Sequence, residues 1–434
     1  MTEYIKKAKV FYQERNINSW LLFFFLVYII FVMKFVSISR LEDNFLFSFY
    51  SLAVAMYILS RFALAYFYEP RYTSSVKFSM GYEPTVTFAV PAKNEGERIR
   101  ETLLRIIKSD YPKHKFDVVA INDGSTDNTL EEMEIAKRIA VERGVSFTLV
   151  NWKKNRGKRD GMAECTRLSK NEIIVFIDSD SFVEPNTARE FVKYFVDPGV
   201  GAVAGQAYVT NAEKNILTKM QSVRYFVAFR AYKAAEALFG MVTCCSGCCS
   251  AYRRSHVMEV LDEWVNQKFL GVKCTYGDDR SLTNMLLKRN RKALFAAEAT
   301  ATTYVPDTFR VFMKQQLRWK KSWVRESVKA GGFIWRKNPI MSISFYMGLL
   351  LPLFAPVVVV RAFFWYPIAT GRMPYFYLLG LVLMAMLYGL YYYIYTKDRN
   401  WVYGVLFATF YTLVLMWQLP YAILNIRDPQ WGTR

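Results

Sequence analysis

Two carboxylates separated by one residue are the part of this chain best suited to chemistry. Asp178 and Asp180 follow an apolar run without charges, and a serine lies between them. Because alternate residues of a strand share a face, both side chains can point to the same side. Two adjacent carboxylates repel each other unless a cation lies between them. A divalent ion such as Mg²⁺ or Mn²⁺, bound also to a substrate diphosphate, would supply that cation.

A glycine-containing basic turn precedes this pair in the sequence. Asn155-Arg-Gly-Lys-Arg-Asp-Gly161 places Lys158 and Arg159 at the predicted start of a helix, an arrangement that suits a diphosphate. It is not a Walker loop, because its glycine spacing differs and neither Ser nor Thr follows the lysine. Asp123 lies in another turn, Asn-Asp-Gly-Ser-Thr-Asp, which has two interpretations: the turn caps the next helix, or Asp123 binds a base or ribose.

These clusters need secondary structure that brings them together, and the pattern between residues 85 and 180 predicts it. Short, continuous apolar runs are typical of parallel strands that are buried on both faces. Helical stretches alternate with them, so the pattern predicts a doubly wound α/β fold. Ligands of such folds bind at the carboxyl ends of the strands, where the polar clusters lie. The predicted strands cover residues 86–90, 118–121 and 173–177, and the predicted helices cover 97–109 and 127–143.

Long apolar stretches at both ends of the chain predict membrane helices. The first two are interpreted as a helical hairpin anchored in the bilayer, and each of the last three is long enough to cross about 30 Å of hydrocarbon. Basic residues before the first stretch and after the second place the N-terminus and the middle region in the cytoplasm. We therefore expect a multi-pass protein of the plasma membrane with a cytoplasmic catalytic domain. The stretches are residues 20–36, 45–68, 341–360, 374–395 and 401–426.

A basic amphipathic helix is predicted before the last apolar stretches. Apolar residues recur there at helical spacing, with lysines and arginines between them, as in helices that lie on an inner leaflet. Trp319 lies off the apolar stripe, which argues against its burial in lipid. A second such helix is predicted at residues 216–238. The chain is thus divided into a membrane hairpin (1–70), a catalytic domain (80–305), an interfacial helix (306–335), channel helices (338–426) and a tail (427–434).

Composition excludes several classes of protein. Hydrophobic residues make up 53% of the chain and its net charge is +20, which excludes disorder, a collagen-like fibre and a small disulfide scaffold. The positive charge suits lipid headgroups or a phosphorylated substrate, and nucleic acid is not expected because the basic residues share the chain with membrane segments. Two adjacent cysteine pairs between residues 244 and 249 suit neither zinc nor, in a cytosolic domain, disulfides, so free thiols are expected.

The order of these motifs resembles that of processive, membrane-embedded family 2 glycosyltransferases, and among them the bacterial class I hyaluronan synthases. The resemblance covers nearly the whole chain. One departure is Cys248, because such synthases commonly have proline after Cys-Ser-Gly. The motifs therefore do not fix the acceptor pocket, or the polymer that it would bind. The motifs that carry the resemblance are Asn122-Asp-Gly-Ser-Thr-Asp127, Gly157-Lys-Arg159, Asp178-Ser-Asp180, Cys245-Ser-Gly with Tyr252-Arg-Arg254, Gly277-Asp-Asp-Arg-Ser-Leu-Thr-Asn284, Gln315-Gln-Leu-Arg-Trp319 and Trp431-Gly-Thr-Arg434.

The resemblance implies a GT-A-like fold with a mixed sheet, and the synthesis and secretion of hyaluronan from UDP-GlcNAc and UDP-glucuronate with Mg²⁺ or Mn²⁺. It implies that Asp279, favoured over Asp278 by motif register, deprotonates the acceptor hydroxyl, and that Asp180 binds the metal. The partners implied are UDP-sugar donors, the growing polysaccharide and the lipid bilayer, with no obligate protein partner. The implied substrate-binding residues are Asp123, Lys158, Arg159, Asp178, Cys245, Gln315, Arg318, Trp319, Trp431 and Arg434.

The tail creates a question of topology. By the resemblance, residues 427–434 help to close the active site and must therefore be cytoplasmic. Three crossings after the catalytic domain would instead leave them outside. We expect either that one of the last three apolar stretches is re-entrant or interfacial, or that a further crossing lies nearby.

Several other functions remain open. A chitin or chitooligosaccharide synthase, or a related synthase of a glucuronate-containing capsule, shares most of these motifs. A non-processive lipid-linked sugar transferase would lack the Gln-x-x-Arg-Trp helix and the tail. A channel or receptor without enzymatic activity would not need Asp180 and Asp279 to converge with Lys158. The sequence therefore predicts that these three residues lie in one pocket.

Overall fold

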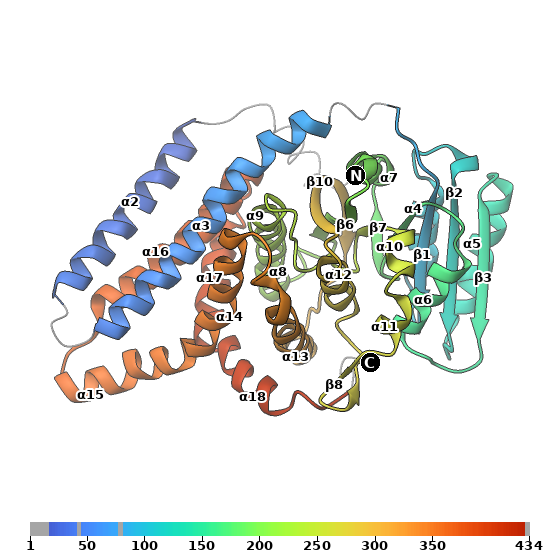
Figure 1. Cartoon of the computed structure of the whole chain (residues 1–434). Coiled ribbons are helices and arrows are strands. Elements are labelled where there is room, and N and C mark those ends of the chain that lie inside the picture. The colour runs from blue at the N-terminus through green and yellow to red at the C-terminus, as the bar shows by residue number, and fades with distance from the viewer. Residues whose placement is uncertain (1–16, 41–44, 77–80, 430–434) are drawn as a thin grey trace.

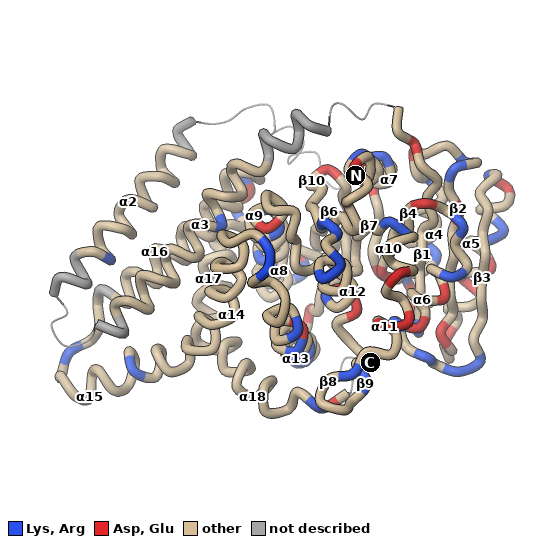
Figure 2. Tube along the Cα trace, in the orientation of Figure 1, with Lys and Arg blue, Asp and Glu red and all other residues tan. Residues whose placement is uncertain are grey.

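The structure is a computed structural model that describes residues 17–40, 45–76 and 81–429. A sheet with its covering helices forms one part, and long apolar helices form the other (Figure 1). Between them lie α8 (Ile216–Val227) and α13 (Phe309–Ile334). Charged residues gather in the sheet part and on the helices beside it, whereas the long helices carry few (Figure 2).

Within the described residues, eight strands form a mixed sheet in the order β3-β2-β1-β4-β7-β6-β10-β5. The first four strands of this order run parallel, β7 is antiparallel to both of its neighbours, and β10 pairs in parallel with β6. This confirms the predicted α/β fold with a mixed sheet. The strands are β1 (Val86–Ala92), β2 (Phe116–Asp123), β3 (Ser146–Trp152), β4 (Ile173–Phe176), β5 (Ser181–Val183), β6 (Val200–Val209), β7 (Ser250–Arg253) and β10 (Lys292–Thr303).

Helices cover both faces of the sheet, so its central strands are fully enclosed. Every residue of β1 and β4 is buried, which explains why these strands are continuous apolar runs rather than alternating ones. The packed helices present one apolar face; in α4 this face includes Leu103 and Ile106. The covering helices are α4 (Ile99–Ile107), α5 (Thr129–Glu142), α6 (Lys158–Leu168), α7 (Thr187–Val192), α10 (Arg254–Met258), α11 (Leu261–Val265) and α12 (Asp278–Lys288).

The long helices include several that are apolar enough to cross a membrane. Among the described residues four stretches meet the length and composition of a span: Ser48–Tyr68, Pro339–Thr370, Tyr377–Thr396 and Trp401–Leu424. A shorter apolar stretch, Trp20–Phe35, pairs with the first of them. The helices are α2 (Ile17–Arg40), α3 (Phe45–Val76), α14 (Pro339–Val360), α15 (Tyr366–Thr370), α16 (Tyr375–Thr396), α17 (Trp401–Leu413) and α18 (Gln418–Leu424).

Helix α14 is interrupted in its hydrogen bonding by two prolines. Pro352 and Pro356 lie in its interior. Because proline has no N–H, the carbonyl groups of Gly348 and Pro352 lack their usual helical donors four residues on. The Tyr50 hydroxyl of α3 donates a hydrogen bond of 2.8 Å to the nearby carbonyl oxygen of Leu351.

The last apolar stretch turns back instead of continuing as one straight helix. Its start is fixed near the sheet part, where Asn400 Nδ2 donates to Glu213 Oε1 at 2.7 Å. The helix breaks after Leu413, and Gln418 Nε2 then donates to the carbonyl oxygen of Met313 in α13 at 3.0 Å. Both ends of this stretch therefore contact the side of the molecule that carries the sheet. In contrast, α15 lies at the far end of the long helices (Figure 1).

This path of the chain predicts on which side of the membrane particular segments lie. An epitope inserted at Gly371, which follows α15, should be accessible from one side of sealed vesicles, and an epitope appended after Arg434 from the other. An epitope at Gly144, an exposed turn of the sheet part, serves as the control and should behave like the C-terminal one. Antibody access to the Gly371 and Gly144 epitopes from the same side would contradict this topology.

Candidate active site

A cavity of about 1490 Å³ opens at the carboxyl ends of β1, β2 and β4. It extends from the sheet past α13 to the long helices, where Tyr57, Gly348 and Gly380 contribute to its wall. Asp180, Asp279 and Lys158 therefore lie in one pocket, as the sequence predicts. Predicted site residues on the cavity wall are Asp123, Lys158, Arg159, Asp178, Asp180, Asp279, Gln315, Arg318 and Trp319.

Asp123 ends β2 and holds the neighbouring basic turn in place. Its carboxylate accepts hydrogen bonds from the backbone N–H groups of Arg156 at 2.6 Å and Gly157 at 2.9 Å. The Arg156 guanidinium in turn stacks on the Trp152 ring, 4.6 Å from its centroid. These contacts fix the backbone immediately before Lys158, while a contact of Asp123 with the nucleotide stays a prediction.

Lys158 and Asp178 form an ion pair on the cavity wall. Burial lowers the pKa of Lys158, but the charge and hydrogen bond of Asp178, with the charges of Asp278 and Asp279, together outweigh burial. They leave that pKa above its ordinary value, so the lysine stays charged. The backbone of Gly247 closes over the pair: a Cβ atom there would lie 3.0 Å from Asp178 Oδ1 and 3.1 Å from Lys158 Nζ. This turn thus places a fixed cation where a diphosphate can reach it.

Asp180 is the carboxylate of this pocket whose negative charge is least balanced by neighbouring groups. Burial, followed by the charge of Asp178, raises the pKa of Asp180 to about 6. Among the described residues no three His, Cys, Asp or Glu side chains cluster into a complete metal site. Mg²⁺ and Mn²⁺ often bind through one or two carboxylates and complete their shell with substrate phosphates and water, so Asp180 fits such an ion.

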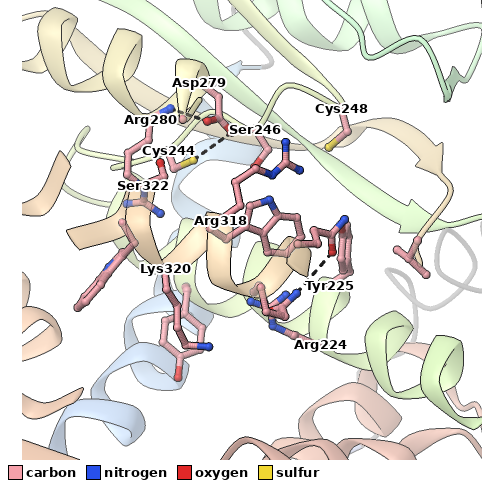
Figure 3. A pocket seen from close by; sticks show the side chains of 18 of the residues that line it. Arg224, Tyr225, Cys244, Ser246, Cys248, Asp279, Arg280, Arg318, Lys320 and Ser322 are labelled. Carbon is pink, nitrogen blue, oxygen red and sulfur yellow. Dashed lines mark hydrogen bonds between the residues drawn. The ribbon is translucent and has the colours of Figure 1, made fainter. Parts of the chain in front are cut away.

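Asp279 lies at the start of α12, next to the buried Asp278. Gly277 precedes them with a left-handed φ of 77°, which turns the chain into the helix. Asp278 is only 4% exposed, whereas Asp279 is half-buried and faces the cavity. The Cys244 thiol lies 3.5 Å from Asp279 Oδ2, and the N–H of Arg280 donates to Oδ1 at 2.8 Å (Figure 3).

The Gln-x-x-Arg-Trp segment of α13 lines the cavity between the sheet and the long helices. The Arg224 guanidinium of α8 lies 5.3 Å from the Trp319 ring centroid, and the Tyr225 ring lies 6.3 Å from it. Arg318 and Lys320 project from the same helix toward the cavity (Figure 3). Trp319 is therefore held in an aromatic and cationic cluster on the cavity wall.

Some predicted residues lie elsewhere than expected. Cys245 is fully buried, and its backbone N–H and C=O are bonded to Thr283 and Tyr252, whereas Cys244 and Cys248 reach the cavity wall. Trp431 and Arg434 lie outside the described residues. The tail just before them is held beside the site, because the hydroxyl of Tyr276 donates to the carbonyl oxygen of Asp428 at 3.0 Å, and Lys321 Nζ contacts Asp428 Oδ2 at 2.8 Å.

The structure also brings in residues that sequence reasoning missed. Lys233 reaches the site from a π-helical turn, Ala228–Lys233, that follows α8, and its ammonium donates to Ser246 Oγ at 2.6 Å. Arg224 enters from α8. In the sequence, a basic residue on a helix next to membrane segments is most simply interpreted as a lipid anchor. The packing of α8 on α13 and α17 directs the side chains of Arg224 and Lys233 toward the site, and no local pattern predicts that packing.

Comparison with known proteins agrees with this geometry. Residues 84–322, more than half of the chain, match the family described as "Glycosyltransferase like family 2". The chain belongs to glycosyltransferase family 2. It is an enzyme that transfers sugars, and the family resemblance predicted from its motifs is confirmed.

Relatives within and around this family cover most of the chain. A hyaluronan synthase of Streptococcus pyogenes serotype M3 is 27% identical over 89% of this chain and 90% of its own length. An N-acetylglucosaminyltransferase of Azorhizobium caulinodans is 30% identical over 81% of this chain and 87% of its own. The solved mannosyltransferase of Pyrobaculum calidifontis, in complex with GDP-Man and Mn²⁺, superposes with a TM-score of 0.55 at 21% identity, covering 84% of this chain and 99% of that one, which shows a GT-A-like fold.

The left-handed turn before Asp279 gives a prediction specific to this glycosyltransferase. Gly277→Ala should lower the free energy of unfolding by about 1–2 kcal/mol from backbone strain alone. Its Cβ would also clash with Ser322 Oγ of α13 and lie 3.0 Å from Arg325 Nη2, so α12 must shift and sugar transfer should fall by on the order of 10²-fold.

Thermal unfolding and turnover of the purified protein measure the two effects. Gly332→Ala is the matched control, because Gly332 lies in α13, has a helical φ, and a Cβ there would meet no atom within 4 Å. That control should be neutral or slightly stabilising. Full activity of Gly277→Ala would contradict the tight turn.

Proposed function

We propose that this chain is a membrane-embedded, processive, inverting glycosyltransferase that makes hyaluronan from UDP-GlcNAc and UDP-glucuronate and secretes it. The observation that carries the proposal is the continuous cavity that joins Asp180 and Asp279 to α3, α14 and α16. A site for transferring soluble sugars alone needs no cavity wall from membrane-type helices. We place the catalytic domain in the cytoplasm of the cell and the long helices, except α17 and α18, across the plasma membrane.

In the proposed reaction the acceptor hydroxyl attacks the anomeric carbon of the donor sugar. Asp279 takes the hydroxyl proton as the new glycosidic bond forms, and the bond from sugar to nucleoside diphosphate breaks on the opposite face. Lys158 and Arg318 bind the diphosphate as it gains negative charge. A divalent ion held by Asp180 would supply further charge stabilisation there. Trp319 stacks on the acceptor sugar, and Cys244 and Cys248, in place of the buried Cys245, line the acceptor pocket.

The charges along the cavity favour an anionic polymer. Arg224 and Lys320 lie where the cavity passes from the sheet part to the long helices. Deeper among the apolar helices, Lys34 of α2 also lies on the cavity wall and contacts Ser51 Oγ. An ionisable residue at membrane depth is costly unless it serves a polar path. A chain with a carboxylate in every second sugar matches such a path better than neutral chitin does.

A chitin-type synthase is the second candidate. The similarity to N-acetylglucosaminyltransferases at 30% identity favours it. The two candidates differ in whether UDP-glucuronate is needed, because a chitin-type product contains N-acetylglucosamine alone.

Purified protein incubated with each UDP-sugar and with both together tests the proposal. Polymer should form only when UDP-GlcNAc and UDP-glucuronate are both present, and Asp279→Asn should abolish it while UDP binding is retained. Loss of a general base costs about 10²–10⁴-fold in rate. Polymer from UDP-GlcNAc alone would select the chitin-type function, and unchanged turnover of Asp279→Asn would overturn the catalytic assignment.

The proposed role of Asp180 gives a further prediction. Chelation by EDTA should stop sugar transfer, and added Mg²⁺ or Mn²⁺ should restore it. Asp180→Asn should lower turnover by on the order of 10²-fold or more at saturating metal, because it removes the charged ligand. Asp110→Asn, at an exposed surface pair with Arg189, is the control and should behave like the unaltered protein. Equal metal dependence of Asp180→Asn and the unaltered protein would exclude Asp180 as a ligand.

A further inference from the structure

Arg159 does not face the cavity as a free cation but lies in a buried ion pair. Its Nε atom donates to Asp278 Oδ1 at 2.7 Å, and the side chains are 3% and 4% exposed. This pair joins the helix that starts at Lys158 to the turn that carries Asp279. Lys158 precedes Arg159 and Asp279 follows Asp278, so this ion pair links the backbone at Lys158 to the backbone at Asp279.

The remaining donors of Arg159 are bonded to α11, to the turn that follows it and to α12 itself. Nη1 donates to the carbonyl oxygen of Trp264 at 3.0 Å and to Gln267 Oε1 at 3.1 Å, and Nη2 donates to Ser281 Oγ at 3.3 Å. The Trp264 indole N–H also donates to Ser281 Oγ, at 2.7 Å. A planar guanidinium fits this fork of acceptors, whereas the single ammonium of lysine does not.

A second buried pair connects the same turn to α13. Gln267 Nε2 lies 3.4 Å from Glu326 Oε2, and Arg325 Nε donates to Glu326 Oε1 at 2.8 Å. Arg325 Nη2 also donates to the carbonyl oxygen of Tyr276, just before the Gly-Asp-Asp turn. The turn is therefore held from α6 on one side and from the Gln-x-x-Arg-Trp helix on the other.

Such a network is a costly way to gain stability. Arg325 and Glu326 have side chains 4% and 1% exposed, so four charges are withdrawn from water in these two pairs. Burying an ion pair costs several kcal/mol of desolvation, and apolar residues of similar volume often stabilise a fold at least as well. The charges instead position the groups, because charge-assisted hydrogen bonds are short and directional.

We infer that Arg159, Asp278, Gln267, Glu326 and Arg325 form a positioning network that sets Asp279 against the donor turn and the acceptor helix. This inference rests on the proposed role of Asp279 as the base. It replaces the expectation that Arg159 binds the donor: Arg159 is a positioning residue, and Lys158 beside it is the residue that meets the diphosphate. The network adds Gln267, Glu326 and Arg325 to the residues on which turnover depends.

Arg159→Lys separates positioning from donor binding. It keeps the positive charge against Asp278 but cannot satisfy the fork of acceptors, so Asp279 should be misplaced. We expect kcat to fall by about tenfold to 10²-fold, with the Kd for UDP unchanged within about twofold. Lys158→Met should instead weaken UDP binding by about tenfold or more. Arg167→Lys, an exposed position on the same helix, is the matched control and should change neither quantity.

Each outcome decides between the alternatives. A Kd for UDP that rises in step with the loss of kcat in Arg159→Lys would mean that Arg159 binds the donor, and an unchanged kcat would mean that the network does not position the base; either result overturns the inference. Unchanged turnover of Asp279→Asn would instead overturn the proposed function itself.

Gln267→Leu provides a second test if Arg159→Lys does not fold. It leaves the ion pair intact but removes the link between Arg159 and Glu326. Its kcat should fall about tenfold with the Kd for UDP unchanged, and the double variant with Glu326→Gln should lose no more than the larger single loss, as expected for residues that act together. A fully active Gln267→Leu, or additive losses in the double variant, would overturn the network.

Discussion

Negative charge concentrated at one edge of the sheet is the constraint on which this structure depends. Asp123, Asp178, Asp180 and Asp279 meet where the strands end, and carboxylates this close must be balanced. Backbone N–H groups satisfy Asp123, and Lys158 pairs with Asp178. Burial and the charge of Asp178 raise the pKa of Asp180, so an added cation is best placed beside Asp180.

The strands that sequence reasoning found are those whose signal is local. β1, β2 and β4 are buried on both faces and therefore read as unbroken apolar runs. β3 alternates between exposed and buried residues, and β7 has only the residues Ser250–Arg253, so neither stands out. The insertion of β7 antiparallel between β4 and β6 depends on pairing between distant segments, which no local pattern contains.

The position of a site residue could be predicted where its motif follows the end of a strand. The direction of its side chain could not be predicted where packing between distant segments decides it. The acidic residues and Lys158 follow strands or start helices, so their meeting follows from the fold. Arg159 contributes to the cavity wall, but its guanidinium is bonded to buried groups, and Cys245 is buried beside the cavity-lining Cys244. Likewise, apolar length alone makes residues 401–424 a membrane span, whereas the bonds from Asn400 to Glu213 and from Gln418 to Met313 show where its two ends lie.

The two prolines of α14 have a consequence for the polarity of the cavity wall. Gly348 and Pro352 line this wall, and their carbonyl groups lack helical donors. A helix in hydrocarbon must satisfy such groups through neighbouring helices, side chains or a water-filled cavity. The cavity wall thus gains two main-chain acceptors one helical turn apart, and both exist because proline stands at positions 352 and 356.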